Sequence, residues 1–192
     1  MNAAVFLDRD GVLIEDVGLL TEPGQIRILP RVAEALKKLK KVGFQLIVVS
    51  NQTVVARGLA SEERVRELNR HLEGLLEDAG APPLDAWYFC PHHPNATLPA
   101  YRIVCDCRKP GIGMFRRAAM ERNLTFGGSF TVGDRISDII AGKIAGCRAI
   151  LVQTGRHLEP PIETAEPMDT EVAPDYICAD LSAATDWILQ KR

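Results

Sequence analysis

Residues 5–13 read VFLDRDGVL, an apolar run that ends in two aspartates one position apart, followed by a glycine. Side chains alternate between the two sides of an extended strand, so Asp8 and Asp10 are predicted to point to one side and Arg9 to the other. Ligands of open α/β sheets bind outside the carboxyl ends of the strands. This stretch therefore predicts a buried strand with two carboxylates that can serve one substrate at its end.

The rest of the chain alternates short aliphatic or β-branched runs with longer helical patterns, which is typical of an α/β fold with a parallel sheet. Strands are predicted at residues 3–7, 45–50, 86–90, 129–132, 149–152 and 176–177. Apolar residues recur at spacings of three and four in the segments 31–42, 61–79, 114–122, 137–145 and 181–190, where we expect helices. The proline- and glutamate-rich residues 155–175 are expected to form an extended surface excursion.

Size and composition favour one globular domain across residues 1–192. The chain has 46% hydrophobic and 25% charged residues and a net charge of -2, so neither disorder nor a strongly basic nucleic-acid-binding face is indicated. The apolar stretch at residues 3–7 is too short for a signal-peptide core, and no segment has the length of a membrane span. We expect a cytoplasmic monomer that acts on a small molecule and binds neither nucleic acid nor membrane.

Polar motifs follow several of the predicted strands directly. Residues 50–52 read SNQ after the second strand, and Asp134 follows the strand at 129–132. Lys109 precedes a predicted helix, which can bring it to the same edge of the sheet. Since the carboxyl ends of parallel strands share one edge, these side chains are predicted to meet Asp8 and Asp10 there.

Together these residues meet the requirements of phosphoryl transfer, namely a nucleophile, cations, hydrogen-bond donors and a proton for the leaving oxygen. We expect Asp8 to attack phosphorus, and Asp10 to protonate the departing alkoxide and later to accept a proton from water. Asp8, the main-chain carbonyl of Asp10 and Asp134 are hard oxygen ligands that suit Mg²⁺. Ser50 and Lys109 are expected to stabilise the phosphoryl group.

Taken singly, each motif has a simpler interpretation. Asp8 and Asp10 could form a strand-to-loop turn, Ser50 could cap a helix, and Lys109 could be solvated. Their occurrence together favours the catalytic interpretation. Asp138 lies one helical turn after Asp134, where it is predicted either to orient the metal site or to be a charge at a helix start.

Cysteine and histidine residues form two closely spaced pairs. Residues 90–93 read CPHH and residues 105–107 read CDC, and three thiolates with one imidazole suit tetrahedral zinc. Because protein ligands would fill all four positions, the zinc is expected to be structural. It would order a loop that leads directly into Lys109. The remaining Cys147 and Cys178 lie in apolar surroundings and are interpreted as ordinary buried thiols.

Residues 5–13, 50–52, 108–110 and 132–139 resemble, in order, the four motifs of the haloacid dehalogenase-like hydrolases. The resemblance covers most of the chain and implies a Rossmann-like sheet, Mg²⁺ dependence and an aspartyl-phosphate intermediate. The intervals between the motifs leave no room for a large cap domain. Short loops, including a zinc loop inserted at residues 90–107, are therefore expected to shape the substrate pocket.

The zinc loop narrows the resemblance to the D-glycero-D-manno-heptose 1,7-bisphosphate 7-phosphatases and the related histidinol-phosphate phosphatases. This resemblance implies zinc ligation by Cys90, His92, Cys105 and Cys107. The substrate contacts it implies are Arg9, Asp16, Gly18, Asn51, Gln52, Thr53, Arg108 and Arg135. Among them, Arg108 is expected to recognise the sugar or its distal phosphate.

The function expected from this resemblance is removal of the 7-phosphate of a heptose bisphosphate in lipopolysaccharide precursor synthesis. Histidinol-phosphate phosphatase is the alternative within the same enzyme class, since it shares the catalytic motifs and the zinc loop. A zinc-stabilised binding module without catalysis is the alternative from another class. The complete set of Asp8, Asp10, Lys109 and Asp134 favours an enzyme.

Overall fold

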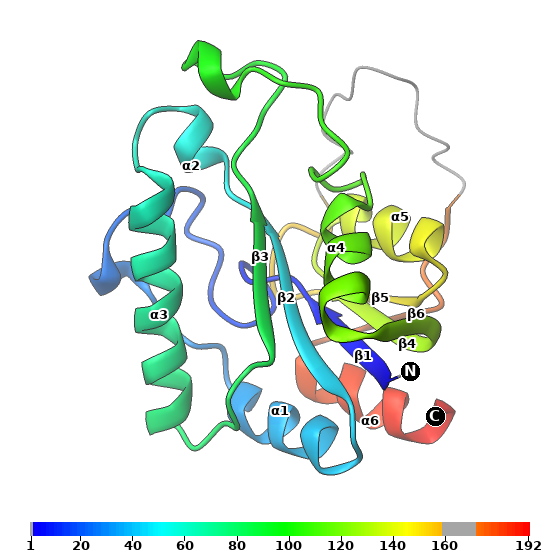
Figure 1. The fold of residues 1–192 in the computed structure, drawn as a ribbon. Coiled ribbons are helices and arrows are strands. Elements are labelled where there is room, and N and C mark those ends of the chain that lie inside the picture. The colour runs from blue at the N-terminus through cyan, green and yellow to red at the C-terminus, as the bar shows by residue number, and fades with distance from the viewer. Residues whose placement is uncertain (1, 159–171) are drawn as a thin grey trace.

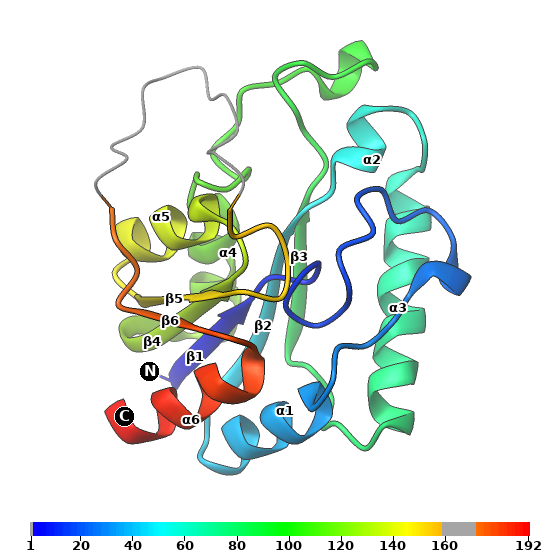
Figure 2. The ribbon, with the colours of Figure 1, turned by 180° about the vertical axis from the view of Figure 1, so that it is seen from behind.

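The computed structural model describes residues 2–158 and 172–192 and shows a single sheet between two layers of helices (Figures 1 and 2). The strands are β1 (Asn2–Leu7), β2 (Gln45–Asn51), β3 (Ala86–Cys90), β4 (Leu124–Gly133), β5 (Arg148–Val152) and β6 (Tyr176–Cys178). The α-helices are α1 (Val32–Lys41), α2 (Thr53–Ala56), α3 (Glu62–Asp78), α4 (Gly113–Arg122), α5 (Ile136–Ala145) and α6 (Leu181–Lys191). Short 3-10 turns lie at Pro23–Gln25 and Pro99–Tyr101. The predicted α/β class is confirmed.

All neighbouring strands are parallel, in the order β3-β2-β1-β4-β5-β6. The chain moves outward from β1 to β3 on one side and from β4 to β6 on the other, so the strand order reverses between β1 and β4. Ligands of doubly wound sheets bind at such a switch point. Leu7 pairs with Val132 there, which places the residues that follow the two strands next to each other.

The sheet is apolar on both faces, which is why β1 reads as a continuous hydrophobic run. Val5 and Leu7 pack into the core formed with α1, α3 and α6, whereas Ala4 and Phe6 pack into the core formed with α4 and α5. All four side chains are fully buried. The strand that carries the aspartates is thus clamped from both sides, and its end has a fixed position.

Two elements differ from the sequence prediction. β4 begins at Leu124 rather than at residue 129, because the pairing of β1 with β4 shifts register between Ala3 and Val5. This irregularity accommodates Gly128, whose φ of 84° lies in the left-handed region. The short helix α2 was not predicted, since four residues are too few for a periodic pattern.

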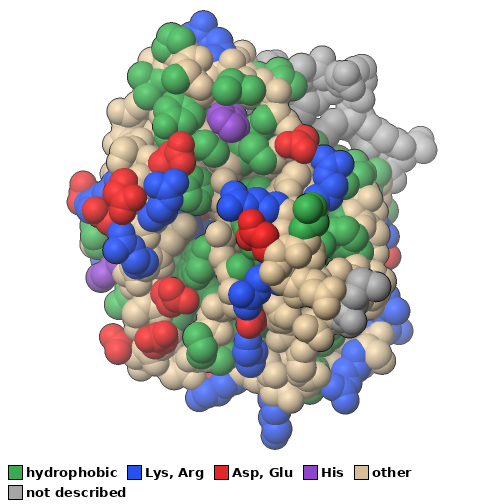
Figure 3. All heavy atoms as spheres, viewed as in Figure 1, with side chains coloured by type: hydrophobic (Ala, Val, Ile, Leu, Met, Phe, Trp, Pro, Cys, Tyr) green, Lys and Arg blue, Asp and Glu red, His purple; other side chains and the backbone are tan. Residues whose placement is uncertain are grey.

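Within residues 2–158 and 172–192, no helix combines the length and the apolar content needed to cross a bilayer. Lys and Arg side chains are interspersed with Asp and Glu side chains on the face shown in Figure 3. The excursion predicted for residues 155–175 falls mostly on residues 159–171, which lie outside the described part of the chain.

Candidate active site

A cavity of about 320 Å³ lies at the carboxyl ends of the strands on both sides of the switch point. The structure brings nearly all of the predicted catalytic and substrate-binding residues to its wall. They are Asp8, Asp10, Asp16, Gly18, Ser50, Asn51, Gln52, Thr53, Arg108, Lys109 and Arg135. Asp134 is fully buried beside Asp8, and only the side chain of Arg9 lies away from the cavity.

Lys109 is the buried cation of the site, with 3% of its surface exposed. Its Nζ lies 3.0 Å from Asp8 Oδ1 and 2.6 Å from Asp138 Oδ1, and it donates to the main-chain oxygen of Val49 at 2.7 Å. Burial lowers the pKa of Lys109, but Asp138 and Asp8 outweigh burial and hold this pKa above its ordinary value. The lysine is therefore charged and fixed beside the predicted nucleophile.

Asp138 lies at the start of α5, as one of the two predictions had it, and it also binds Lys109. Its Oδ1 binds Lys109, and its Oδ2 accepts the main-chain N–H of Arg135 at 3.0 Å, at the start of α5. The carboxylate thus caps the helix and neutralises the lysine. Asp138 supports the site through Lys109.

Asn51 fixes the main chain of Lys109 from the end of β2. Its Nδ2 donates to the carbonyl oxygen of Lys109 at 3.0 Å, and its Oδ1 accepts the main-chain N–H of Lys109, also at 3.0 Å. This pair of hydrogen bonds joins two segments that are far apart in the sequence. The lysine is consequently positioned at both its main chain and its side chain.

Replacing Lys109 with methionine is expected to lower the free energy of unfolding by about 3–5 kcal/mol, because it leaves two buried carboxylates without their cation. Urea unfolding of zinc-loaded protein without Mg²⁺ measures this loss. Lys143→Met is the matched control, since Lys143 forms an ion pair of 2.6 Å with Asp175 that is partly exposed to solvent. That control should change stability by no more than about 1 kcal/mol. Equal losses in the two variants would contradict the assigned role.

Asp8 and Asp134 have the properties of cation ligands. The ligand oxygens of Asp8, Asp134 and Asp138 all lie within 4.8 Å of one another. Asp134 Oδ1 is buried and has no hydrogen-bond partner among the described residues, and Asp8 Oδ1 makes only its ion pair with Lys109. Burial, together with Asp8 and Asp138, raises the pKa of Asp134 to about 8. A divalent cation would offset this repulsion, so the donor set fits Mg²⁺.

Two glycines make room for the Asp134 carboxylate. A Cβ at Gly11 would lie 2.5 Å from Asp134 Oδ2, and a Cβ at Gly155 would lie 2.1 Å from the same atom. Gly11 also has a φ of 75°, which other residues rarely adopt. The main-chain N–H of Arg156 donates to Asp134 Oδ2 at 2.7 Å. Only glycine at both positions leaves space for this buried acid.

Arg9 contacts Asp10, the predicted acid/base group, on the side away from the cavity. Its side chain is 2% exposed, and its Nη2 donates to both carboxylate oxygens of Asp10, at 3.0 and 2.9 Å. Gln52 accepts from the same Nη2 at 2.9 Å and donates through Nε2 to Asp10 Oδ2 at 3.1 Å and to Ser50 Oγ at 2.7 Å. The side chain of Arg9, expected to contact substrate, is thus directed at Asp10 on the side away from the cavity.

Asp16 organises the cavity rim. Its Oδ1 accepts the main-chain N–H of Gly18 at 2.7 Å, and its Oδ2 lies 2.7 Å from Arg156 Nε and 3.3 Å from Arg135 Nη2. Burial raises the pKa of Asp16, but these hydrogen bonds and charges bring it below its ordinary value. The carboxylate is therefore ionised and joins two arginines at the entrance.

The sequence analysis did not identify six residues of the cavity wall, and three of them have basic side chains, namely Arg57, His93 and Arg156. Arg57 follows α2, the helix that periodicity could not detect. His93 directly follows the predicted zinc ligand His92. Arg156 had a detectable signal, because it lies in the loop directly after β5 at the same edge of the sheet.

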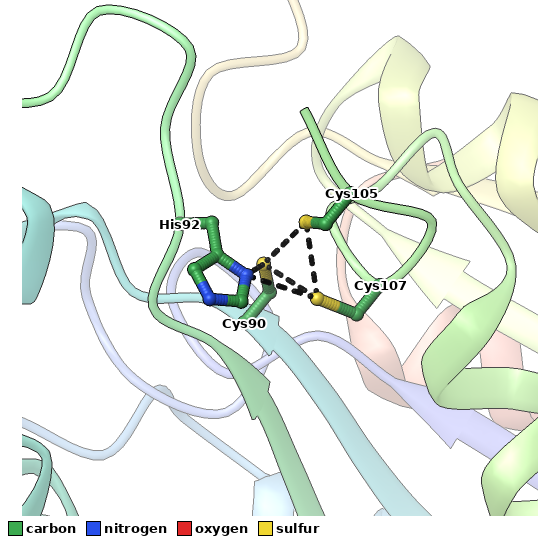
Figure 4. A group of neighbouring side chains, drawn as sticks. All are labelled: Cys90, His92, Cys105 and Cys107. Atoms are coloured by element: carbon green, nitrogen blue, oxygen red, sulfur yellow. Dashed lines mark hydrogen bonds between the residues drawn. The ribbon is translucent and has the colours of Figure 1, made fainter. Parts of the chain in front are cut away.

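The cysteine and histidine pairs meet in one cluster, formed by Cys90, His92, Cys105 and Cys107 (Figure 4). The three sulfur atoms lie 3.1 to 3.5 Å apart. His92 Nδ1 lies 3.4 Å from Cys107 Sγ and 3.8 Å from Cys90 Sγ. A tetrahedral zinc site has edges of about 3.5–3.8 Å between its ligand atoms, so the four groups are arranged closely enough to hold zinc.

Cys107 is the thiol of the cluster whose pKa is lowered, whereas the pKa values of Cys90 and Cys105 are raised. A hydrogen bond with the Cys90 thiol lowers the pKa of Cys107 to about 5, although partial burial opposes this shift. Cys107 is followed directly by Arg108, whose Nη1 donates to the carbonyl oxygen of His92 at 3.1 Å. The cluster and the cationic wall of the cavity therefore belong to one continuous piece of structure.

The sequence is similar to known phosphatases. The family model described as HAD-hydrolase-like matches residues 106–184. The D-glycero-beta-D-manno-heptose-1,7-bisphosphate 7-phosphatase of Photorhabdus laumondii is 40% identical over 84% of this chain and 86% of its own length. The D-glycero-D-manno-heptose-1,7-bisphosphate 7-phosphatase of Thermosynechococcus vestitus is 39% identical over 96% of this chain and 94% of its own.

A solved structure agrees with these relatives. The D,D-heptose 1,7-bisphosphate phosphatase of B. bronchiseptica, crystallised with magnesium and phosphate, superposes with a TM-score of 0.80 at 30% identity, and the match covers 99% of each chain. The chain therefore belongs to the haloacid dehalogenase-like hydrolases and, within them, to the D-glycero-D-manno-heptose-1,7-bisphosphate 7-phosphatases, a family of phosphoric monoester hydrolases.

Proposed function

We propose that this protein is a Mg²⁺-dependent phosphatase that removes the 7-phosphate of D-glycero-D-manno-heptose 1,7-bisphosphate. The observation that carries the proposal is the contact of Lys109 with Asp8, 3.0 Å apart, on the wall of a cavity that four arginines also line. The names of the relatives support the choice of substrate. The cluster of three cysteines and His92 supports a structural zinc ion.

In the proposed reaction, an Asp8 oxygen attacks phosphorus and the bond from phosphorus to the sugar oxygen breaks. Asp10 gives its proton to the departing alkoxide, which leaves an aspartyl phosphate on Asp8. Water then attacks the aspartyl phosphate and gives a proton to Asp10, and inorganic phosphate leaves. Lys109 neutralises charge beside Asp8 throughout, and Mg²⁺, when held by Asp8, Asp134 and the Asp10 carbonyl, neutralises charge on the phosphate oxygens.

The charges around the cavity favour a substrate with two phosphates. Besides Lys109, the wall carries Arg57, Arg108, Arg135 and Arg156. Apart from Asp8, Asp10 and Asp138, its only carboxylate among the described residues is Asp16, which is paired with two of these arginines. Such a wall suits a second anionic group on the substrate.

The same charges weigh against histidinol phosphate, which brings an ammonium group in place of a second phosphate. An ammonium facing these arginines is repelled. The non-catalytic alternative is weaker still, since Asp8, Lys109 and Asp134 are assembled as catalysis requires and the relatives are named phosphatases. The bisphosphate is therefore the preferred substrate of this proposal.

A phosphate-release assay with Mg²⁺ tests this choice. Both anomers of the heptose bisphosphate, histidinol phosphate and heptose 7-phosphate are the substrates, the last as the matched control that lacks the 1-phosphate. We expect kcat/KM for the preferred bisphosphate anomer to exceed that for histidinol phosphate by at least about 100-fold, since the site rejects the ammonium group. A kcat/KM for histidinol phosphate equal to or above that of both anomers would refute the substrate assignment.

A further inference from the structure

Asn69 is a buried polar residue in the middle of α3. It is 9% exposed and lies on the inward side of the helix with Val65, Leu68 and Leu72. The outward side carries exposed ion pairs such as Arg66 with Glu62. Asparagine is a poor helix former, and burying its amide is unfavourable unless the amide is hydrogen-bonded. The residue therefore needs a specific partner.

That partner is Arg9. Asn69 Oδ1 accepts a hydrogen bond from Arg9 Nη1 at 3.0 Å, and this is a buried contact between two segments 60 residues apart. Arg9 Nη2 is the atom that binds Asp10 and Gln52, while Arg9 Nε has no partner among the described residues. A guanidinium group is planar and rigid, so an anchor at Nη1 sets the direction in which Nη2 points. Asn69 thus fixes the orientation of the group that holds Asp10.

We propose that Asn69 is a positioning residue for the acid/base group, acting on Asp10 through Arg9. Asp10 depends on this support, because its side chain is 22% exposed at the cavity and the described residues that hold it are Arg9 and Gln52. General acid catalysis requires the proton donor to be within hydrogen-bond reach of the leaving oxygen. The inference rests on the proposed function, in which Asp10 protonates that oxygen.

This role predicts a dependence on the leaving group. A sugar alkoxide is a poor leaving group and needs a proton from Asp10 as its bond to phosphorus breaks. The phenolate released from p-nitrophenyl phosphate leaves without protonation. Loss of Asn69 should therefore lower kcat/KM for the sugar phosphate and spare kcat/KM for the aryl phosphate, whereas general damage to the fold lowers both.

The test compares kcat/KM for the best sugar phosphate and for p-nitrophenyl phosphate in Asn69→Ala, with Mg²⁺ and zinc present. We expect a loss of about 10-fold or more for the sugar phosphate and of less than about 2-fold for the aryl phosphate, a fraction of the 10²–10⁴ that a general acid contributes. If Asn69→Ala does not fold, Asn69→Ser is used in its place, because it also removes the amide oxygen that accepts from Arg9. Equal losses on the two substrates, or no loss, would overturn the inference.

Three further variants complete the experiment. Leu72→Ala truncates another buried side chain of α3 and should not change the ratio of the two kcat/KM values. Asn69→Asp retains the acceptor oxygen and should stay within about threefold of the wild-type ratio, because the contact with Arg9 survives. Asp10→Asn should show the largest change in this ratio. If this ratio changes in Asp10→Asn but not in Asn69→Ala, the role of Asn69 is refuted. If the ratio does not change in Asp10→Asn, the proposed role of Asp10 itself is refuted.

Discussion

Asp8→Asn is expected to lower kcat for phosphate release by at least about 10⁴-fold, the scale on which enzymes lose activity with their nucleophile. The neutral amide keeps the shape of Asp8 but cannot form the aspartyl phosphate. It also removes one charge from a buried group of three carboxylates, Asp8, Asp134 and Asp138, that lie close together. The variant should therefore fold and retain its melting temperature while phosphate release falls, as measured with the best substrate of the wild-type protein.

Asp106→Asn is the matched control for this change. Asp106 is an exposed carboxylate that pairs with Arg116 at 2.6 Å, and its loss should leave kcat within about twofold, as expected for a surface ion pair. Circular dichroism and thermal unfolding should show that both variants are folded. Retention of more than about one hundredth of wild-type kcat by Asp8→Asn would show that another group attacks phosphorus.

Loss of one zinc ligand is expected to lower both the stability and the activity of the protein. Cys107→Ala removes a thiolate from the four-residue cluster, and the protein should lose its bound zinc. A structural zinc site contributes several kcal/mol, so a loss of about 3 kcal/mol would lower Tm by about 6–12 °C. Activity should fall with it, because Arg108 and Lys109 follow Cys107 directly and depend on the order of that loop.

The control for this experiment is Cys147→Ala. Cys147 is also a free thiol, but it is buried in the core around α4 and α5 and is not part of the cluster. Its variant should retain one zinc per chain by elemental analysis of the purified protein. Wild-type protein that contains no zinc, yet melts at the same temperature with and without added zinc, would contradict the structural-zinc proposal.

The strands and the core of the site could be predicted because local signals determined them. Apolar runs set the cores of β1 and β2, and the polar residues that follow them reach one edge by the geometry of a parallel sheet. The start of β4 was missed since Gly127 and Gly128 suggest a turn, while the sheet accommodates them in an irregular register. The start of β4 depends on its pairing with β1, which local sequence patterns do not determine.

The contacts among site residues could not be predicted for the same reason. The Asn69 to Arg9 contact joins α3 to the end of β1, and no spacing in the sequence encodes it. Likewise, the sequence placed Asp138 one helical turn from Asp134 but could not show that it binds Lys109. Such contacts form only when the fold brings together segments that are far apart in the sequence, and local sequence patterns do not show which segments meet.

The cysteine and histidine cluster divides the loop between β3 and α4 into a base and an arc. Its members Cys90, His92, Cys105 and Cys107 lie at the base, whereas residues 93–104 form the arc, closed by a hydrogen bond from His93 N to Tyr101 O at 3.1 Å. Changes of length within the arc leave the base, and hence Lys109, where they are. Descendants of this chain can therefore diversify the substrates they accept by insertion and deletion in the arc while their chemistry stays constant.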